Sequence, residues 1–258
     1  MSLISFEKKE KYCIITLNQP EKRNALSTEL IGKLKEKLLS ISKDKDINVV
    51  ILRGNGPVFS SGHDLNELIK KEEDITYFKN IFLKCSKLME SIKKMPQIVI
   101  AQVHGAASAA GLLLVLSCDL AVADTNTKFS TPGVKIGLFC ITPMVPLSRS
   151  ITRKRALDML LTGRNISAKE ALDFGMINRV VAPDRLFQET EKLAETISKY
   201  SLYTLGLGKK AFYEQSDMDE KTAYNYAVEK ISENCISYDA QEGISAFLEK
   251  RRPNWKDK

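Results

Sequence analysis

The stretch HGAASAAGLLLVLSCDL, residues 104–120, constrains the fold more than any other part of the sequence. Its first half is a run of small residues, and residues 112–116 are five consecutive large aliphatic residues. A helix from about Ala110 would be apolar on every side, so other elements must surround it. The preceding turn has little side-chain bulk, so a ligand or another segment can approach its backbone closely.

The first half of the chain alternates strand, Gly/Ser-rich turn and helix three times, with no shared sequence repeat. This alternation predicts an α/β layered fold. Apolar spacing predicts strands at 12–18, 49–52, 98–103 and 120–123, and helices at 27–42, 65–94 and from about 110.

The second half is expected to be almost wholly helical after about residue 143, apart from a strand at 177–181. Residues 184–250 form amphipathic patterns with charged faces, too polar to make a core alone. We therefore expect this part to dock on the main body or on another subunit. The predicted division is a core of residues 1–195 and a helical C-terminal region of residues 196–258.

Composition limits the classes of site that the chain can hold. The net charge of +7 is spread along the chain, which suits a small anionic ligand. The five cysteines are widely spaced without a CxxC pair, which predicts reduced thiols. Only two histidines are present, so we expect no metal site.

The sequence indicates a cytoplasmic location. The N-terminus lacks the apolar core of a secretory signal. The longest apolar run, residues 109–116, is far shorter than the roughly 18 residues that a membrane span needs. A mitochondrial matrix protein after removal of its leader would have the same features.

Two turns are candidates for a binding site. One is the small-residue turn before Ala110, and the other is VFSSGHDL, residues 58–65. The first N–H groups of a helix lack internal partners and carry the positive end of its dipole. Such groups can stabilise a ligand oxygen that becomes negative during a reaction. Alternatively, the small residues only let two elements pack tightly.

His63 can be interpreted in two ways. Its ring is the obvious candidate acid or base. It can equally be a residue whose backbone N–H matters and whose ring only packs. Asp64 is expected to cap the helix that follows.

The chain resembles the crotonase superfamily, the enoyl-CoA hydratase/isomerase family, over essentially its whole length. It is most similar to the subgroup of enoyl-CoA hydratase domain-containing proteins that lacks both catalytic glutamates. The resemblance implies a ββα spiral core, a helical C-terminal trimerisation region and an acyl-CoA thioester ligand, with no other cofactor. It rests on TLNQPEKRNALS (16–27), VFSSGHDLNEL (58–68), AASAAGLLLVLSCDLAVAD (106–124), FSTPGVKIGLF (129–139) and EGISAFLEKR (242–251).

The resemblance also implies individual site residues. The family's oxyanion hole, two backbone N–H groups that bind the thioester oxygen, falls on His63 and Ala110. Phe247 and Lys250 match residues that reach CoA from the C-terminal helix, across a subunit boundary. The implied substrate-binding residues are Arg23, Ala25, Ser61, His63, Leu65, Ala110, Pro132, Leu138, Phe247 and Lys250.

The sequence departs from the family at both acid/base positions. The hydratases place two glutamates around one water molecule, and here those positions hold Leu113 and Gly133. Residues 112–116 and 129–141 contain no acidic residue, so a small shift of alignment does not restore either glutamate. A general acid or base contributes about 10²–10⁴-fold to a rate, so we expect hydration of 2-enoyl-CoA to be weak or absent.

Three functions are alternatives to hydration of 2-enoyl-CoA. The chain could be an enzyme with a borrowed base such as bicarbonate, as in dihydroxynaphthoyl-CoA synthases, although Thr131 and Cys140 depart from their segment. His63 and Cys140 are the remaining local proton donors or acceptors, and Cys140 is expected to be inert. A second alternative is a non-catalytic acyl-CoA binder or scaffold.

The third alternative is RNA binding through a comb of lysines on the first helix, which one relative in the superfamily uses. The corresponding positions here are Thr28, Gly32 and Glu36, so the comb is absent. We therefore expect no specific nucleic-acid partner. We also expect no membrane partner, and the resemblance implies a homotrimer or a hexamer built from two trimers.

Overall fold

The computed structural model describes residues 2–69 and 74–258. Its main sheet has six strands in the order β1-β2-β3-β4-β6-β9, in which β1 and β2 are antiparallel and every other neighbouring pair is parallel. The strands are β1 (Ile4–Lys8), β2 (Tyr12–Leu17), β3 (Val49–Gly54), β4 (Ile98–Val103), β6 (Leu120–Asp124) and β9 (Arg179–Val181). The predicted α/β class is confirmed.

A second, three-stranded sheet in the order β5-β7-β8 lies next to the candidate turns. The pair β5–β7 is parallel and the pair β7–β8 is antiparallel. Each strand has three residues, too few for an apolar period to identify it. The strands are β5 (Ala106–Ser108), β7 (Lys128–Ser130) and β8 (Asn165–Ser167), and β8 also corrects the expectation of an almost wholly helical second half.

The helices follow the sequence expectations closely. Helix α1 starts after Ser27, whose hydroxyl oxygen accepts the Leu30 N–H as an N-cap. The expected helix 65–94 is two helices, with residues 70–73 outside the described part. The helices are α1 (Thr28–Ile41), α2 (Leu65–Ile69), α3 (Ile75–Lys94), α4 (Ala110–Ser117), α5 (Ile141–Ser150), α6 (Arg153–Thr162), α7 (Ala168–Phe174), α8 (Leu186–Ser198), α9 (Leu202–Gln215), α10 (Glu220–Cys235) and α11 (Tyr238–Leu248), with short 3-10 turns η1 (Pro20–Lys22), η2 (Pro132–Ile136) and η3 (Pro183–Arg185).

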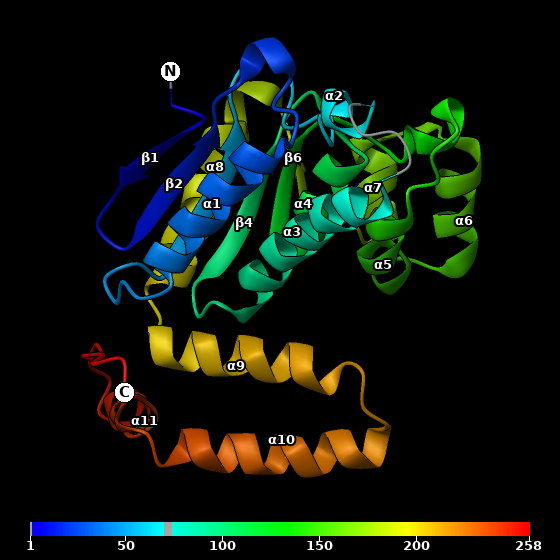
Figure 1. Ribbon diagram of the computed structural model, residues 1–258. Helices are drawn as coiled ribbons and strands as arrows, with labels where there is room; N and C mark the ends of the chain where they lie inside the picture. Colours follow the sequence, from blue (N-terminus) through cyan, green and yellow to red (C-terminus); the bar gives the residue numbers. More distant parts are fainter. Residues whose placement is uncertain (1, 70–73) are drawn as a thin grey trace.

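The six-stranded sheet is covered on both faces (Figure 1). Helices α1, α3 and α4 pack on one face, against side chains such as Ile15 and Leu17 of β2. Helix α8 packs on the other face, against Ile14 and its neighbours. Successive residues of a strand point to opposite faces, so β2, with both faces covered, is buried along its whole length.

Helix α9 docks on the main body through a buried lysine, as expected for this region. Lys209 Nζ donates to the carbonyl oxygens of Ile92 (2.7 Å) and Gln97 (2.8 Å) and to Asp119 Oδ2 (2.7 Å). The Tyr213 hydroxyl donates to Asp119 Oδ1 at 2.9 Å. All three ammonium protons therefore have acceptors, which a buried charge requires.

Helices α10 and α11 continue beyond α9 on the side away from the sheet (Figure 1). Helix α10 has no buried residue in the single chain and packs against α9 and α11. The predicted boundary between residues 195 and 196 falls inside α8, and the division into two parts stays a prediction. None of the described helices has the length and apolar character needed to cross a lipid bilayer.

Candidate active site

The two candidate turns lie against each other. Ser60 forms an isolated parallel β-bridge with Ala107. The Ser108 N–H donates to the Ser60 carbonyl oxygen at 3.0 Å, and the Ser60 N–H donates to the Ala106 carbonyl oxygen at 3.2 Å. Two segments almost fifty residues apart are thus joined by backbone hydrogen bonds, which do not depend on side-chain identity.

Gly62 is required at this contact. Its φ is 104°, and a Cβ atom there would lie 2.9 Å from the Ser108 carbonyl oxygen and 3.3 Å from the Ala110 nitrogen. Only glycine adopts that conformation without strain and leaves this space free. Gly62 therefore lets the 58–65 turn lie directly against the turn before Ala110.

The N–H groups of His63 and Ala110 lack hydrogen-bond partners in the described ranges, and Ala110 is fully buried. Ala110 is the first residue of α4, so its N–H has no partner inside the helix. Ala109 precedes it with φ 48° and ψ −114°, a strained conformation for a residue with a Cβ atom. Both donors predicted for an oxyanion hole thus lie in adjoining turns.

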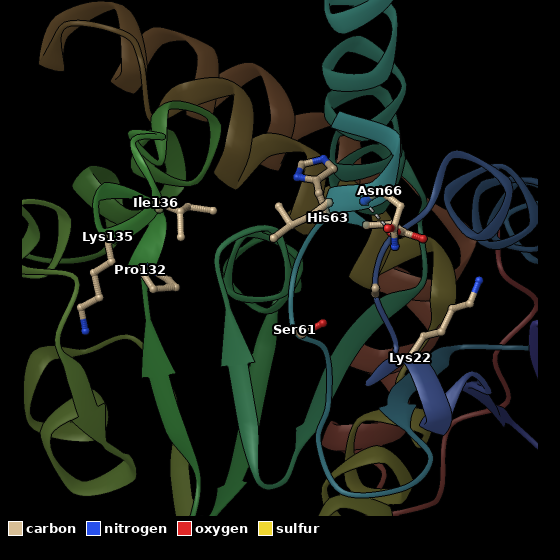
Figure 2. A pocket seen from close by; sticks show the side chains of 11 residues that line it. Lys22, Ser61, His63, Asn66, Pro132, Lys135 and Ile136 are labelled. Atoms are coloured by element: carbon tan, nitrogen blue, oxygen red, sulfur yellow. Dashed lines mark hydrogen bonds between the residues drawn. The ribbon is translucent and has the colours of Figure 1, made fainter. Parts of the chain in front are cut away.

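A pocket of about 570 Å³ opens beside these turns (Figure 2). It brings together segments from η1, the 61–66 turn and η2. Among the residues predicted from sequence it contains Ala25, Ser61, His63, Leu65, Pro132 and Gly133. It also contains Lys22, Asp64, Asn66, Lys135 and Ile136.

The two lysines of the pocket were missed by sequence reasoning. Lys22 and Lys135 are exposed and lie on opposite sides of the pocket in Figure 2. Both lie in segments on which the family resemblance rests, and their positive charge could have indicated an anion-binding role. Together they make the pocket favourable for an anionic ligand.

The His63 ring packs rather than facing a proton-transfer partner. It meets the Phe82 ring edge to face, with 5.3 Å between centroids. Its Nε2 is buried and has no hydrogen-bond partner in the described structure. Burial lowers the pKa of His63 below its ordinary value, and the charge of Glu67 opposes this shift. Of the two interpretations, the geometry favours a neutral ring that packs and a backbone N–H that is available.

Asp64 takes the capping role that the sequence indicated. Its Oδ1 accepts the Asn66 backbone N–H at 3.0 Å, at the start of α2. Glu67 then ties α2 to α1, because its carboxylate accepts the Thr28 N–H (2.9 Å) and the Thr28 hydroxyl (2.9 Å). The segment that carries His63 is therefore held to the core on both sides.

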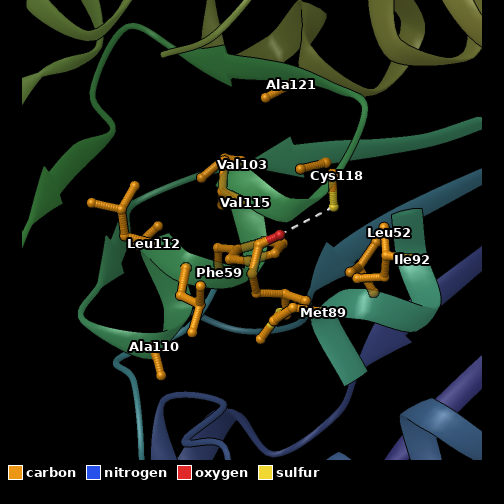
Figure 3. Close-up of a cluster of buried hydrophobic side chains, with 14 of the residues drawn as sticks. Leu52, Phe59, Met89, Ile92, Val103, Ala110, Leu112, Val115, Cys118 and Ala121 are labelled. Carbon is orange, nitrogen blue, oxygen red and sulfur yellow. Dashed lines mark hydrogen bonds between the residues drawn. The ribbon is translucent and has the colours of Figure 1, made fainter. Parts of the chain in front are cut away.

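Helix α4 is enclosed by apolar side chains (Figure 3). Ala110, Leu112 and Val115 of α4 lie among side chains of β3, β4 and α3, including Leu52, Val103 and Met89. Leu113 is 4% exposed and belongs to the same core. A carboxylate at this position would have an apolar environment, so its charged form would be disfavoured.

Gly133 lines the pocket but has no space for a side chain. A Cβ atom there would lie 2.3 Å from the Leu138 carbonyl oxygen and 3.0 Å from Cys140 Sγ. Cys140 itself is 8% exposed, and burial raises the pKa of its thiol. The thiol is therefore protonated at neutral pH, in agreement with the expectation of an inert cysteine.

Five predicted binding residues lie outside the pocket lining, and one of them, Ala110, is the buried first residue of α4. The Arg23 carbonyl oxygen accepts the Ser61 N–H at 3.0 Å, so Arg23 supports the pocket turn through its backbone. Leu138 is in the exposed loop after η2. Phe247, which is 82% exposed, and Lys250 lie at the α11 end, far from α2 in Figure 1. Their contact with CoA across a subunit boundary stays a prediction.

Comparison with known proteins places the chain in a family. The family model described as enoyl-CoA hydratase/isomerase matches residues 7–258. Human enoyl-CoA hydratase domain-containing protein 3, mitochondrial, is 46% identical over 93% of this chain and 79% of its own length.

Solved structures agree with this assignment. The crystal structure of that human protein superposes with a TM-score of 0.95 and 44% identity, over 98% of this chain and all of that one. A Mycobacterium smegmatis enoyl-CoA hydratase gives a TM-score of 0.95 and 40% identity over 99% of both chains. The chain belongs to the enoyl-CoA hydratase/isomerase family and has its crotonase fold.

Proposed function

We propose that this protein binds acyl-CoA thioesters in the pocket of Figure 2 and holds the thioester oxygen between the N–H groups of His63 and Ala110. The observation that carries the proposal is the pair of free backbone donors in two turns in direct contact. Donors of this kind act on an oxygen that becomes enolate-like, and one can contribute roughly 2.7–4 kcal/mol. Lys22 and Lys135 supply positive charge for the phosphates of CoA.

The chemistry beyond binding is limited by what surrounds the thioester. No proton can move through Leu113, which is part of the core, or through Gly133, which has no room for a side chain. The His63 ring is neutral and packs on Phe82. We therefore propose that 2-enoyl-CoA hydration by the two-glutamate mechanism is weak or absent.

A non-catalytic acyl-CoA binder is the second candidate function. The crowding at Gly133 favours this candidate, because the Leu138 carbonyl oxygen and Cys140 Sγ fill the space that the side chain of the second acid would need. A borrowed base such as bicarbonate is a third candidate, and it would have to bind in the pocket beside Gly133. Adding bicarbonate during an activity assay separates these two candidates.

We further propose a homotrimer, or a hexamer of two trimers, formed through the C-terminal helices. The exposed apolar residues of α10 and α11, such as Val228, Ile231 and Phe247, support this assembly. The cytoplasmic location stays a prediction, with the mitochondrial matrix as its alternative. Sedimentation velocity tests the assembly, and a monomer at micromolar concentration would contradict it.

Thermal unfolding with and without crotonyl-CoA tests the ligand assignment. A ligand that binds only the native state at 100 times its Kd stabilises it by about 2.7 kcal/mol, which corresponds to a Tm increase of about 5–10 °C in a chain of this size. Crotonate without CoA is the matched control and should give no comparable shift. An unchanged Tm at saturating crotonyl-CoA would contradict the proposal.

A further inference from the structure

A second cavity, of about 620 Å³, lies on the opposite face of the six-stranded sheet. It opens at the carboxyl ends of β2, β3, β4 and β6, beside the start of α8. It shares no lining residue with the pocket of Figure 2. Ligands of open α/β sheets commonly bind at the carboxyl ends of strands. The polar groups that line this cavity determine what it can bind.

Gln102, near the end of β4, is the unusual group of this cavity. Its side chain is buried, with 7% of the residue exposed, and its Oε1 has no hydrogen-bond partner. Its amide nitrogen also donates to no residue of the described ranges. A buried polar group without a partner costs about 1–3 kcal/mol, so such groups call for an explanation. A ligand hydroxyl or amine that donates to Oε1 would explain it.

Arg53 lies next to Gln102 across the sheet, because the two residues are Cα partners in the pairing of β3 and β4. Its Nε donates to Thr16 Oγ1 at 3.0 Å, and its guanidinium lies 5.4 Å from the centre of the Phe187 ring. No carboxylate within the described ranges lies in ion-pair distance of it. Guanidinium has five N–H donors, so several remain free for an anion.

Asp124, at the end of β6, supplies the opposite charge. Its Oδ1 accepts the Asn126 N–H (2.8 Å) and the Thr127 hydroxyl (3.0 Å), whereas its Oδ2 accepts from no described residue. Gln102 pairs with Val122, so Asp124 is two residues further along the neighbouring strand. The residue is only 6% exposed. The cavity therefore presents free donors from β3 and β4 and free acceptors from β4 and β6.

The start of α8 completes the lining. Leu186 and Phe187, the first two residues of this 13-residue helix, border the cavity, and no side chain caps the helix. The positive end of the helix dipole adds to the charge of Arg53 and favours an anion at this side of the cavity.

We propose that this cavity is a second binding site, for a small oxyanion that also carries a hydroxyl or amine donor. The anionic group binds the guanidinium of Arg53 and Nε2 of Gln102, and the hydroxyl or amine donates to Gln102 Oε1 and to Asp124 Oδ2. Hydroxycarboxylates and phosphate esters of small polyols share this chemistry. The site is independent of the acyl-CoA pocket, since the two have no residue in common.

Calorimetric titration of the full chain with malate, glycerol 3-phosphate and succinate tests the proposal. Succinate is the matched control for malate because it lacks the hydroxyl group. We expect saturable binding of malate or glycerol 3-phosphate, and succinate at least about tenfold weaker than malate if malate binds. Binding of malate alone assigns a carboxylate, and binding of glycerol 3-phosphate alone assigns a phosphate. Equal affinity for succinate and malate would overturn the role of Asp124.

Variants locate the binding. Arg53→Gln and Gln102→Leu should each weaken binding at least about tenfold, since each removes hydrogen bonds to a charged group. Gln102→Leu should not lower the Tm, because it removes an unpaired buried polar group. Arg179→Gln, at an exposed arginine of β9 outside the cavity, should bind like the original chain.

Two results would overturn the second site. One is no saturable binding of malate or glycerol 3-phosphate to the folded protein. The other is unchanged affinity in both Arg53→Gln and Gln102→Leu. Saturating crotonyl-CoA should not displace the probe. A failure of the acyl-CoA proposal would therefore leave this result unaffected.

Discussion

The two turns at His63 and Ala110 differ sharply from the two positions at Leu113 and Gly133, although Ala110 and Leu113 are only one helical turn apart. The turns keep free N–H groups, a glycine contact and a strained residue, all features of the backbone. The other two positions depend on side chains, and neither has one that can move a proton. Hydrogen bonds from backbone N–H groups survive many changes of side chain. Proton transfer requires a titratable side chain, so it is lost when that side chain is replaced.

The surroundings reinforce this difference. Because Gly62 has no side chain, it leaves free the space beside the Ser108 carbonyl oxygen and the Ala110 nitrogen, and glycine alone fits there. At Gly133 the Leu138 carbonyl occupies the space that a side chain would need. We therefore expect a side chain added at Gly62 to disrupt the turns. We also expect that substituting glutamate at Leu113 or Gly133 alone does not restore a working acid or base.

The largest expected effect is that of Leu113→Glu, which puts a carboxyl group where an acid is absent. Leu113 is 4% exposed among apolar side chains, so the new carboxyl must be buried. Burial raises a carboxyl pKa by up to 3–5 units, so keeping the buried group protonated costs up to about 4 kcal/mol of stability at pH 7. Chemical denaturation measures it.

Leu113→Met is the matched control for this substitution, with an expected cost below about 1.5 kcal/mol. If Leu113→Glu unfolds at the same denaturant concentration as Leu113→Met, the position is hydrated. The interpretation of Leu113 as closed core would then be wrong.

Gly62→Ala tests the turns. The added methyl group would meet the Ser108 carbonyl oxygen, in a conformation with φ 104°. We expect a loss of about 2–4 kcal/mol of unfolding free energy and a loss of crotonyl-CoA binding. Gly32→Ala in α1 is the control, because a Cβ atom there has no neighbour within 4 Å and should stabilise the helix. Unchanged crotonyl-CoA affinity in Gly62→Ala would show that these turns do not bind the ligand.

Gly133→Ala tests the crowding at the second acid position. Its methyl group would displace the Leu138 carbonyl, but Leu138 lies in an exposed loop that can shift. We therefore expect a smaller loss, about 1–3 kcal/mol, measured by denaturation. A stability equal to that of the original chain would show that the loop opens readily, and that a glutamate could be accommodated.

The smallest effect on binding is expected for His63→Leu. If only the N–H of residue 63 binds the ligand, crotonyl-CoA affinity should change by less than about threefold. A tenfold loss would assign a role to the ring.

The His63 ring should also affect the pH dependence of stability. Its pKa is lowered in the fold, so below pH 6.5 the unfolded state binds more protons. Stability should then fall as the pH falls from 6.5 through the folded-state pKa. His63→Leu should reduce this slope between pH 6.5 and 4.5, in unfolding measured at several pH values. An identical slope in the variant would contradict a buried neutral ring.

Local patterns made much of the fold predictable. The apolar positions Leu30, Ile31, Leu34, Leu38 and Ile41 predicted α1, and they are its buried residues. Strand β4 matches its expected range. Strands β5, β7 and β8 were missed because three residues carry no period, and their pairing partners are distant in sequence.

The candidate site was predictable where it depends on single residues. The turns at His63 and Ala110 and the absent acids could be located from the residues and the resemblance. The crowding at Gly133 could not be predicted from the sequence, because it arises from the loop conformation that places the Leu138 carbonyl oxygen against Gly133. The position of Arg53 beside the partnerless Gln102 could not be predicted either, since it depends on the register between β3 and β4.

We propose that the protein binds acyl-CoA without hydrating it efficiently. The most direct test follows the enoyl-thioester absorbance of crotonyl-CoA at a concentration shown to saturate the purified protein. We expect an absorbance loss about 10²–10⁴-fold slower than that of a two-glutamate hydratase at equal concentration, with or without bicarbonate. A rapid loss of absorbance would contradict it.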